Sequence, residues 1–161
     1  MGFKLYASRE DRIKFITSLD DAVVAETEEQ RDAFKRYLDT GDETLLTLQG
    51  EPVRWQLRPL TMATWELACR DARGIAVKGI YTDLPTAREL LRLSCEDADP
   101  WPAEWGKKED AFRFEYRRKV LSPQFAERIP PGVCLEAAKV LLDSLPLDQE
   151  VTAPFGESGG R

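Results

Sequence analysis

The chain has 161 residues, of which 42% are hydrophobic and 32% are charged, and its net charge is −6. This length corresponds to one domain that can bury a hydrophobic core without disulfides or a structural metal. The negative charge argues against a nucleic-acid-binding protein, because contact with phosphates requires a basic surface.

Cysteine usage and hydropathy predict an intracellular protein. The three cysteines, Cys69, Cys95 and Cys134, are widely spaced and form no CxxC pair, which is typical of buried thiols in a reducing compartment. The first residues lack the apolar segment of a secretory signal, and no apolar run approaches the roughly 18 residues of a membrane-spanning helix. We therefore expect a cytoplasmic protein that has no membrane partner.

The first clear element is a capped helix. Within residues 11–19 the apolar residues are Ile13, Phe15, Ile16 and Leu19, in an order that fits either a helix or a strand. Thr27 and Gln30 then form a capping-box pattern, and Gly41 stands where a helix C-cap glycine is expected. The sequence predicts a helix over residues 28–39.

A β-hairpin is predicted next. Two short apolar runs, residues 44–49 and 53–57, flank the turn-forming residues 50–52. Apolar and polar residues alternate in the second run, which indicates one buried face and one solvated face. Arg54 and Arg58 fall on the solvated side. Thr61 then predicts the N-cap of a helix, with an apolar face made of Met62, Trp65, Cys69 and Ala72.

The second half of the chain predicts mainly helices. After a strand or loop at residues 74–81, Pro85 is well placed to start a helix that ends near Cys95. A long polar connection leads to a helix at about residues 109–121. A short helix from Pro123 and a final helix over residues 133–145 follow.

Together these elements predict an α+β fold, with a small antiparallel hairpin or sheet near residues 45–58 packed on a mostly helical C-terminal half. We expect residues 1–146 to form one domain. Residues 147–161 are rich in Pro, Gly and Ser and predict a flexible tail.

The residues that catalysis commonly uses are scarce. The chain has no histidine, which removes the commonest general base near neutral pH and the usual zinc ligand. It also lacks a phosphate-binding glycine loop. Glu96, Asp97 and Asp99 could coordinate a hard cation, but a solvated helix end is the favoured interpretation. We therefore predict no enzyme activity, no cofactor and no metal.

Two further features concern partners. A segment with Arg113, Arg117 and interleaved aromatic residues resembles a nucleic-acid patch, but acidic residues lie among them and the whole chain is acidic. Residues 1–50 contain seven Lys/Arg and eleven Asp/Glu, whereas residues 101–130 contain seven and five. This asymmetry fits either head-to-tail association or a solvated surface.

Trp101 and Trp105 are interface anchors if they are exposed, and cover the core if they are buried.

A stretch of about residues 18–72 resembles a known family. A "YLDTGD" element leads into "GEPVRWQLRPLT" and then into a helix. This arrangement resembles the tail assembly chaperones and other small tail-morphogenesis proteins of long-tailed bacteriophages. The chain departs from the family pattern in its long N-terminal segment and in having Trp55 where a phenylalanine is more usual.

The resemblance implies a non-enzymatic protein of the host cytoplasm that binds the tape-measure protein and tail-tube subunits. Self-association is a further expectation. The partner-binding residues predicted on this basis are Arg54, Arg58, Trp101 and Trp105. One alternative is a structural or connector protein that is retained in the phage virion. A second, less favoured alternative is a metal-dependent hydrolase that uses Glu96, Asp97 and Asp99.

Overall fold

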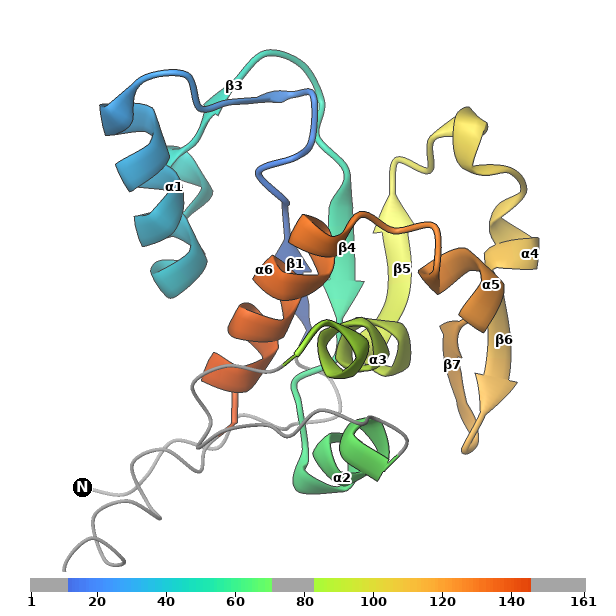
Figure 1. The fold of residues 1–161 in the computed structure, drawn as a ribbon. Coiled ribbons are helices and arrows are strands. Elements are labelled where there is room, and N and C mark those ends of the chain that lie inside the picture. The colour runs from blue at the N-terminus through green and yellow to red at the C-terminus, as the bar shows by residue number, and fades with distance from the viewer. Residues whose placement is uncertain (1–11, 71–82, 146–161) are drawn as a thin grey trace, which may run out of the picture.

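A computed structural model describes residues 12–70 and 83–145. A three-stranded antiparallel sheet lies at its centre, in the order β1 (Ile13–Phe15), β4 (Arg54–Leu57), β5 (Cys95–Asp99) (Figure 1). Trp55 on the central strand is paired with Phe15 on one side and Ala98 on the other. All three side chains are buried, so one face of the sheet belongs to the core.

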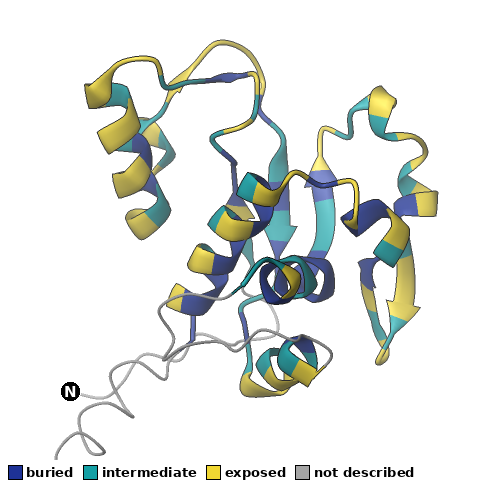
Figure 2. Ribbon diagram, in the orientation of Figure 1, coloured by how far each residue is buried: buried dark blue, intermediate teal, exposed yellow. Residues whose placement is uncertain are grey.

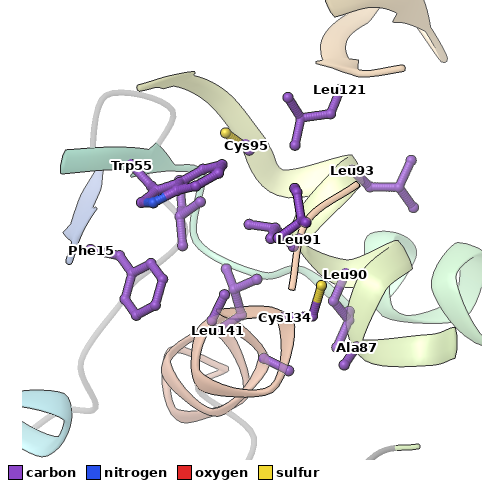
Figure 3. Close-up of a cluster of buried hydrophobic side chains, with 14 of the residues drawn as sticks. Phe15, Trp55, Ala87, Leu90, Leu91, Leu93, Cys95, Leu121, Cys134 and Leu141 are labelled. Atoms are coloured by element: carbon purple, nitrogen blue, oxygen red, sulfur yellow. The ribbon is translucent and has the colours of Figure 1, made fainter. Parts of the chain in front are cut away.

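Helices cover this buried face. α3 (Leu84–Ser94) packs against α6 (Pro131–Asp143), and α2 (Met62–Arg70) packs against α3. Figure 3 shows leucines of α3, Cys134 and Leu141 of α6 and Trp55 of the sheet meeting in one cluster. The helices α3 and α6 agree with the prediction, as does the N-cap hydrogen bond from Thr64 N to Thr61 Oγ1, which is 3.2 Å long.

A smaller unit adjoins this core. α1 (Glu28–Thr40) has the predicted capping box, and Gly41 ends it in the left-handed conformation with φ of 75°. A second cluster of buried residues joins this helix to the chain before it; it consists of Ile16, Val23, Phe34 and Tyr37. The hydroxyl of Tyr37 accepts a hydrogen bond from the amide of Ile16, at 2.9 Å.

The predicted α+β class is confirmed, but the hairpin within it is wrong. β3 (Thr47–Leu48) pairs with β2 (Val23–Val24) in a separate two-stranded sheet that lies beside the 3₁₀-helix η1 (Glu43–Leu45). β4 pairs instead with β1 and β5. The alternation of buried and half-buried residues along β4 is as predicted. β4 pairs with β1 and β5, and not with β3, because Phe15 and Ala98 extend the buried face on both sides of Trp55.

The predicted helix at 109–121 is also wrong. Only α4 (Lys108–Ala111) is helical there, and a β-hairpin follows, made of β6 (Phe112–Glu115) and β7 (Arg118–Leu121). The two strands contain Phe112, Phe114 and Val120, and aromatic and β-branched residues of this kind favour strands. Arg113 and Arg117 therefore do not share a helix face. Figure 1 shows the hairpin at the side of the molecule, next to α5 (Pro123–Ala126).

Two smaller expectations also need correction. Met62 is 44% exposed, whereas Thr64 and Ala68 are the buried residues of α2, so the buried face is rotated from the predicted one. β5 lies in the stretch expected to be a polar connection, which also contains the 3₁₀-helix η2 (Ala103–Trp105). Ala72, the segment 74–81 and the tail 147–161 lie outside the described residues.

Candidate functional site: an aromatic pocket beside the sheet

The two tryptophans predicted as contact residues stack against the core. Trp105 lies 5.3 Å from Trp55 between ring centroids, and Trp101 meets Trp105 edge to face at 5.1 Å. Phe125 of α5 contacts both, with centroids 5.4 Å from Trp101 and 5.8 Å from Trp105. Both tryptophans are half-buried, so each has one side against the core and part of its surface exposed.

Trp105 forms one wall of a pocket of about 310 Å³, which we call the Trp105 pocket. The pocket is built by segments that are far apart in the sequence: the turn after β1, the start of β4, η2, α5 and the start of α6. Its apolar lining consists of Leu19, Val53, Trp55, Trp105, Phe125, Ile129 and Val133. Aromatic and aliphatic walls of this kind are typical of binding pockets in proteins.

Charged groups surround this apolar lining. Arg128 lies over the ring of Phe125, at 5.5 Å from its centroid, and its side chain is exposed. Asp21 and Glu104 are also exposed at the rim. The rim therefore presents both signs of charge to an entering group.

Asp20 has a structural role at the pocket. One carboxylate oxygen accepts a hydrogen bond from the amide of Ala22, and the other accepts from the amide of Val53, both at 2.8 Å. These bonds attach the turn after β1 to the start of β4. Asp20 therefore holds the pocket wall in place.

The same turn is attached to α6. Glu136 accepts hydrogen bonds from the Thr17 hydroxyl at 2.6 Å and from the Ser18 amide at 3.0 Å. A Cβ atom at Gly132 would lie only 2.9 Å from Cδ1 of Leu19, so a glycine here leaves room for that side chain. Leu19 is 53% exposed even though it lines the pocket.

Arg54 and Arg58 do not join the Trp105 pocket. Arg54 projects from the opposite side of β4, and its guanidinium pairs with Glu43 at 2.9 Å and Glu51 at 2.8 Å. These ion pairs raise the pKa of Arg54. The four predicted contact residues are thus divided between the two sides of the sheet.

Arg58 joins several elements of the same chain. Its guanidinium donates to Glu96 at 3.0 Å, to the carbonyl of Leu93 at 2.9 Å and to that of Lys119 at 2.6 Å. These bonds connect the end of β4 to α3, β5 and β7. The geometry therefore gives Arg58 a structural function.

Glu96 and Asp97, in the acidic run at residues 96–99, also interact with cationic side chains of the same chain. Glu96 accepts hydrogen bonds from Arg12 and Gln56 in addition to Arg58, and Asp97 forms an ion pair with Lys108. Burial works against the charge of Glu96, but these hydrogen bonds lower its pKa. Within residues 12–70 and 83–145, no group of three or more Cys, Asp or Glu side chains is arranged to hold a metal ion.

The cysteines are in surroundings that disfavour the thiolate. Cys95 and Cys134 are buried in the core, and Cys69 is half-buried. Burial raises the pKa of Cys95 to about 12 and also raises the pKa of the other two thiols. A nucleophilic cysteine requires the opposite shift.

Comparison of the chain with known protein families, with curated proteins and with solved structures finds no match. Among the helices of the described ranges, none combines the length and apolar character needed to cross a membrane.

Sequence reasoning missed Leu19, Phe125 and Arg128 as residues of the pocket. No regular spacing in the sequence relates these three residues, because the pocket brings together segments that are many residues apart. Gly132 is the one local signal, since a glycine in the first turn of a helix can indicate a close neighbour.

Proposed function

We propose that the protein is a non-enzymatic chaperone of tail assembly in a long-tailed bacteriophage and that it binds its partner protein at the Trp105 pocket. The observation that carries this proposal is the pocket itself, with an aromatic floor and a rim of mixed charge. The partner would be the tape-measure protein, with tail-tube subunits recruited to the same complex in the host cytoplasm.

The pocket suits an apolar side chain on a helical partner. A long helical protein that awaits assembly exposes an apolar stripe, and such a stripe binds to grooves through a few anchoring side chains. Buried aromatic residues contribute most of the binding energy at interfaces of this kind. Trp105 and Leu19 are placed to meet the anchor, and Arg128 and Glu104 to meet polar residues that flank it.

Of the four residues predicted from the resemblance, this proposal retains two as contact residues. Trp105 contacts the anchor directly, and Trp101 supports Trp105 through their edge-to-face contact. Arg54 and Arg58 already have partners within the chain, and we expect substitutions at these positions to act on stability.

Capture of the partner with two matched variants tests the proposal. Leu19→Glu places a charge at the pocket, whereas Leu135→Glu places the same charge on the exposed side of α6. Leu19 is 53% exposed and Leu135 is 46% exposed, so neither change disturbs a buried residue. Tagged wild-type protein and both variants are recovered from the producing cells, and the chains that co-purify are identified by mass spectrometry.

The expected result is that wild-type protein and Leu135→Glu recover a long helical tape-measure protein and that Leu19→Glu does not. Equal recovery by both variants would show that the pocket is not the binding site. The bait should also be absent from finished particles. Stoichiometric recovery of the bait in particles would favour the alternative of a structural component of the virion.

A further inference from the structure

The β6–β7 hairpin presents aromatic side chains to solvent. Phe114 is 77% exposed and Tyr116 is 58% exposed, although most other large apolar residues of the described ranges are covered. Figure 2 shows exposed residues along the outer strand of this hairpin. β7 packs against α3 and β5, which leaves β6 as the outer strand.

The turn of this hairpin contains bulky residues in a costly conformation. Tyr116 and Arg117 have φ of 52° and 63°, which is the left-handed region. Two-residue hairpin turns of this type strongly prefer Asn-Gly or Asp-Gly. Other residues adopt the left-handed conformation at an energetic cost, because their Cβ atom crowds the following carbonyl oxygen. A costly conformation that holds two long side chains at the tip of a hairpin suggests a role for those side chains.

The hairpin is also a basic region in an acidic protein. Residues 112–121 contain three arginines and one lysine against one glutamate, which is a net charge of +3. Because the whole chain carries −6, the remaining residues carry −9. Lys119 lies over the ring of Phe112, at 4.6 Å from its centroid, so cationic and aromatic groups share one face.

A complementary acidic surface lies at the start of α1. Glu26, Glu28, Glu29 and Asp32 are exposed there. No ion pair found in residues 12–70 and 83–145 uses any of these four carboxylates. α1 and the hairpin lie at opposite sides of the molecule in Figure 1, so they cannot meet within one chain.

We infer that the hairpin docks on the start of α1 of a second copy of this chain. Tyr116 and Phe114 supply the apolar contact, and Arg117 and Lys119 face the carboxylates of Glu28 and Glu29. Because the two surfaces differ, the contact is heterologous and joins copies head to tail. Its charged rim makes the association weaken as salt is added. This inference does not rest on the chaperone proposal, since it involves other residues and no other protein.

Sedimentation velocity on the purified full chain tests this inference over a range of protein and salt concentrations. Arg117→Glu alters the hairpin and Glu29→Arg alters α1. Arg70→Glu reverses another exposed cation, at the end of α2, and is the control. Phe114→Ser removes the apolar contact without a change of charge. All these side chains are exposed, and circular dichroism verifies that each variant is folded.

We expect the sedimentation coefficient of the wild-type protein and of Arg70→Glu to rise with concentration and to fall when salt is added. Arg117→Glu, Glu29→Arg and Phe114→Ser should each sediment as monomers. A mixture of Arg117→Glu and Glu29→Arg should associate again, because the intact hairpin of one fits the intact α1 of the other. A hairpin-to-hairpin dimer would instead leave Glu29→Arg associated as in the wild type.

Several results would overturn the inference. One is a wild-type protein that stays monomeric at every concentration, and another is a pair of variants that do not associate when mixed. Binding of a labelled single-stranded oligonucleotide that depends on Arg117, by a protein that stays monomeric, would identify the patch as a nucleic-acid site.

Discussion

Arg92 of α3 donates a hydrogen bond to Glu115 of β6 at 2.8 Å and also binds Glu89, one turn earlier on its own helix, at 2.7 Å. The arginine side chain is nearly buried, and it reaches the carbonyl of Leu121 as well, at 3.1 Å. This one side chain therefore attaches both strands of the exposed hairpin to the core helix.

Removal of this arginine should loosen the hairpin. Arg92→Leu leaves two carboxylates without their shared cation, and the loss of one member of a buried pair costs about 3 kcal/mol of unfolding free energy. Arg113 binds the same Glu115 but is 49% exposed, so Arg113→Leu should cost less than about 1 kcal/mol. Urea unfolding of both variants measures the difference, and equal losses would contradict the role assigned to Arg92.

Acid should lower the unfolding free energy of the protein through protonation of Glu115. The hydrogen bond from Arg92, above all, lowers the pKa of Glu115 from its ordinary value of 4.5. A carboxyl with a lower pKa in the folded state stabilises the fold above pH 4.5, and the contribution is lost as the pH falls through the folded-state value. Unfolding free energy measured from neutral to acid pH should therefore decrease less in Glu115→Gln than in the wild type. Glu127→Gln, at an exposed position after α5, is the control variant.

The hydroxyl of Tyr37 should matter for stability at ordinary and at high pH. Tyr37→Phe leaves the buried amide of Ile16 without its acceptor, at a cost of roughly 1–2 kcal/mol. Burial, as the main cause, raises the pKa of Tyr37 to about 12 from 10.0. The unfolded chain ionises first, so the contribution of Tyr37 is complete below pH 10.0 and is lost as the pH rises toward about 12. Thermal melts across this range should fall more steeply for the wild type than for Tyr37→Phe, and parallel curves would refute the assignment.

Substitution of Gly132 should leave the stability of the protein nearly unchanged but weaken its binding to the partner. Gly132→Ala adds a Cβ that would meet Leu19 Cδ1 at 2.9 Å, so the end of the leucine side chain must move. Alanine also has a higher helix propensity than glycine, and this gain partly offsets the cost of that movement. We expect a nearly unchanged melting temperature together with weaker capture of the partner. A large drop in melting temperature would mean that Leu19 cannot move.

The helices were the most predictable part of the fold, because their signals are local. Asp83 and Pro85 begin α3, Thr27 caps α1, and apolar residues recur at helical spacing in α6. β5 was missed because "CEDAD" contains three carboxylates, which are acceptable in a strand only where cations such as Arg58 and Lys108 face them. That compensation comes from distant residues and leaves no local pattern.

The β6–β7 hairpin was missed for a different reason. Its turn contains Tyr116 and Arg117 in place of the usual glycine and asparagine, so the strongest short-range signal of a hairpin is absent. Without that signal, the apolar residues between 109 and 121 fit a helix, which is the element that the sequence predicts. Trp105, which lines the pocket, and Trp101, which packs against it, are among the predicted contact residues. The pocket also depends on the turn at residues 17–21 and on α5, which only the tertiary structure brings to Trp105.

The strand order of the central sheet also determines when it can form. Its three strands occupy residues 13–15, 54–57 and 95–99, so the first strand is made well before either neighbour. Contacts between such distant segments form slowly, because long loops must close before any pairing is gained. α1 and the β6–β7 hairpin need only nearby residues. During synthesis the early strand and the apolar face of the sheet must therefore wait for later parts of the chain, and the core is closed only when α6, at residues 131–143, has left the ribosome.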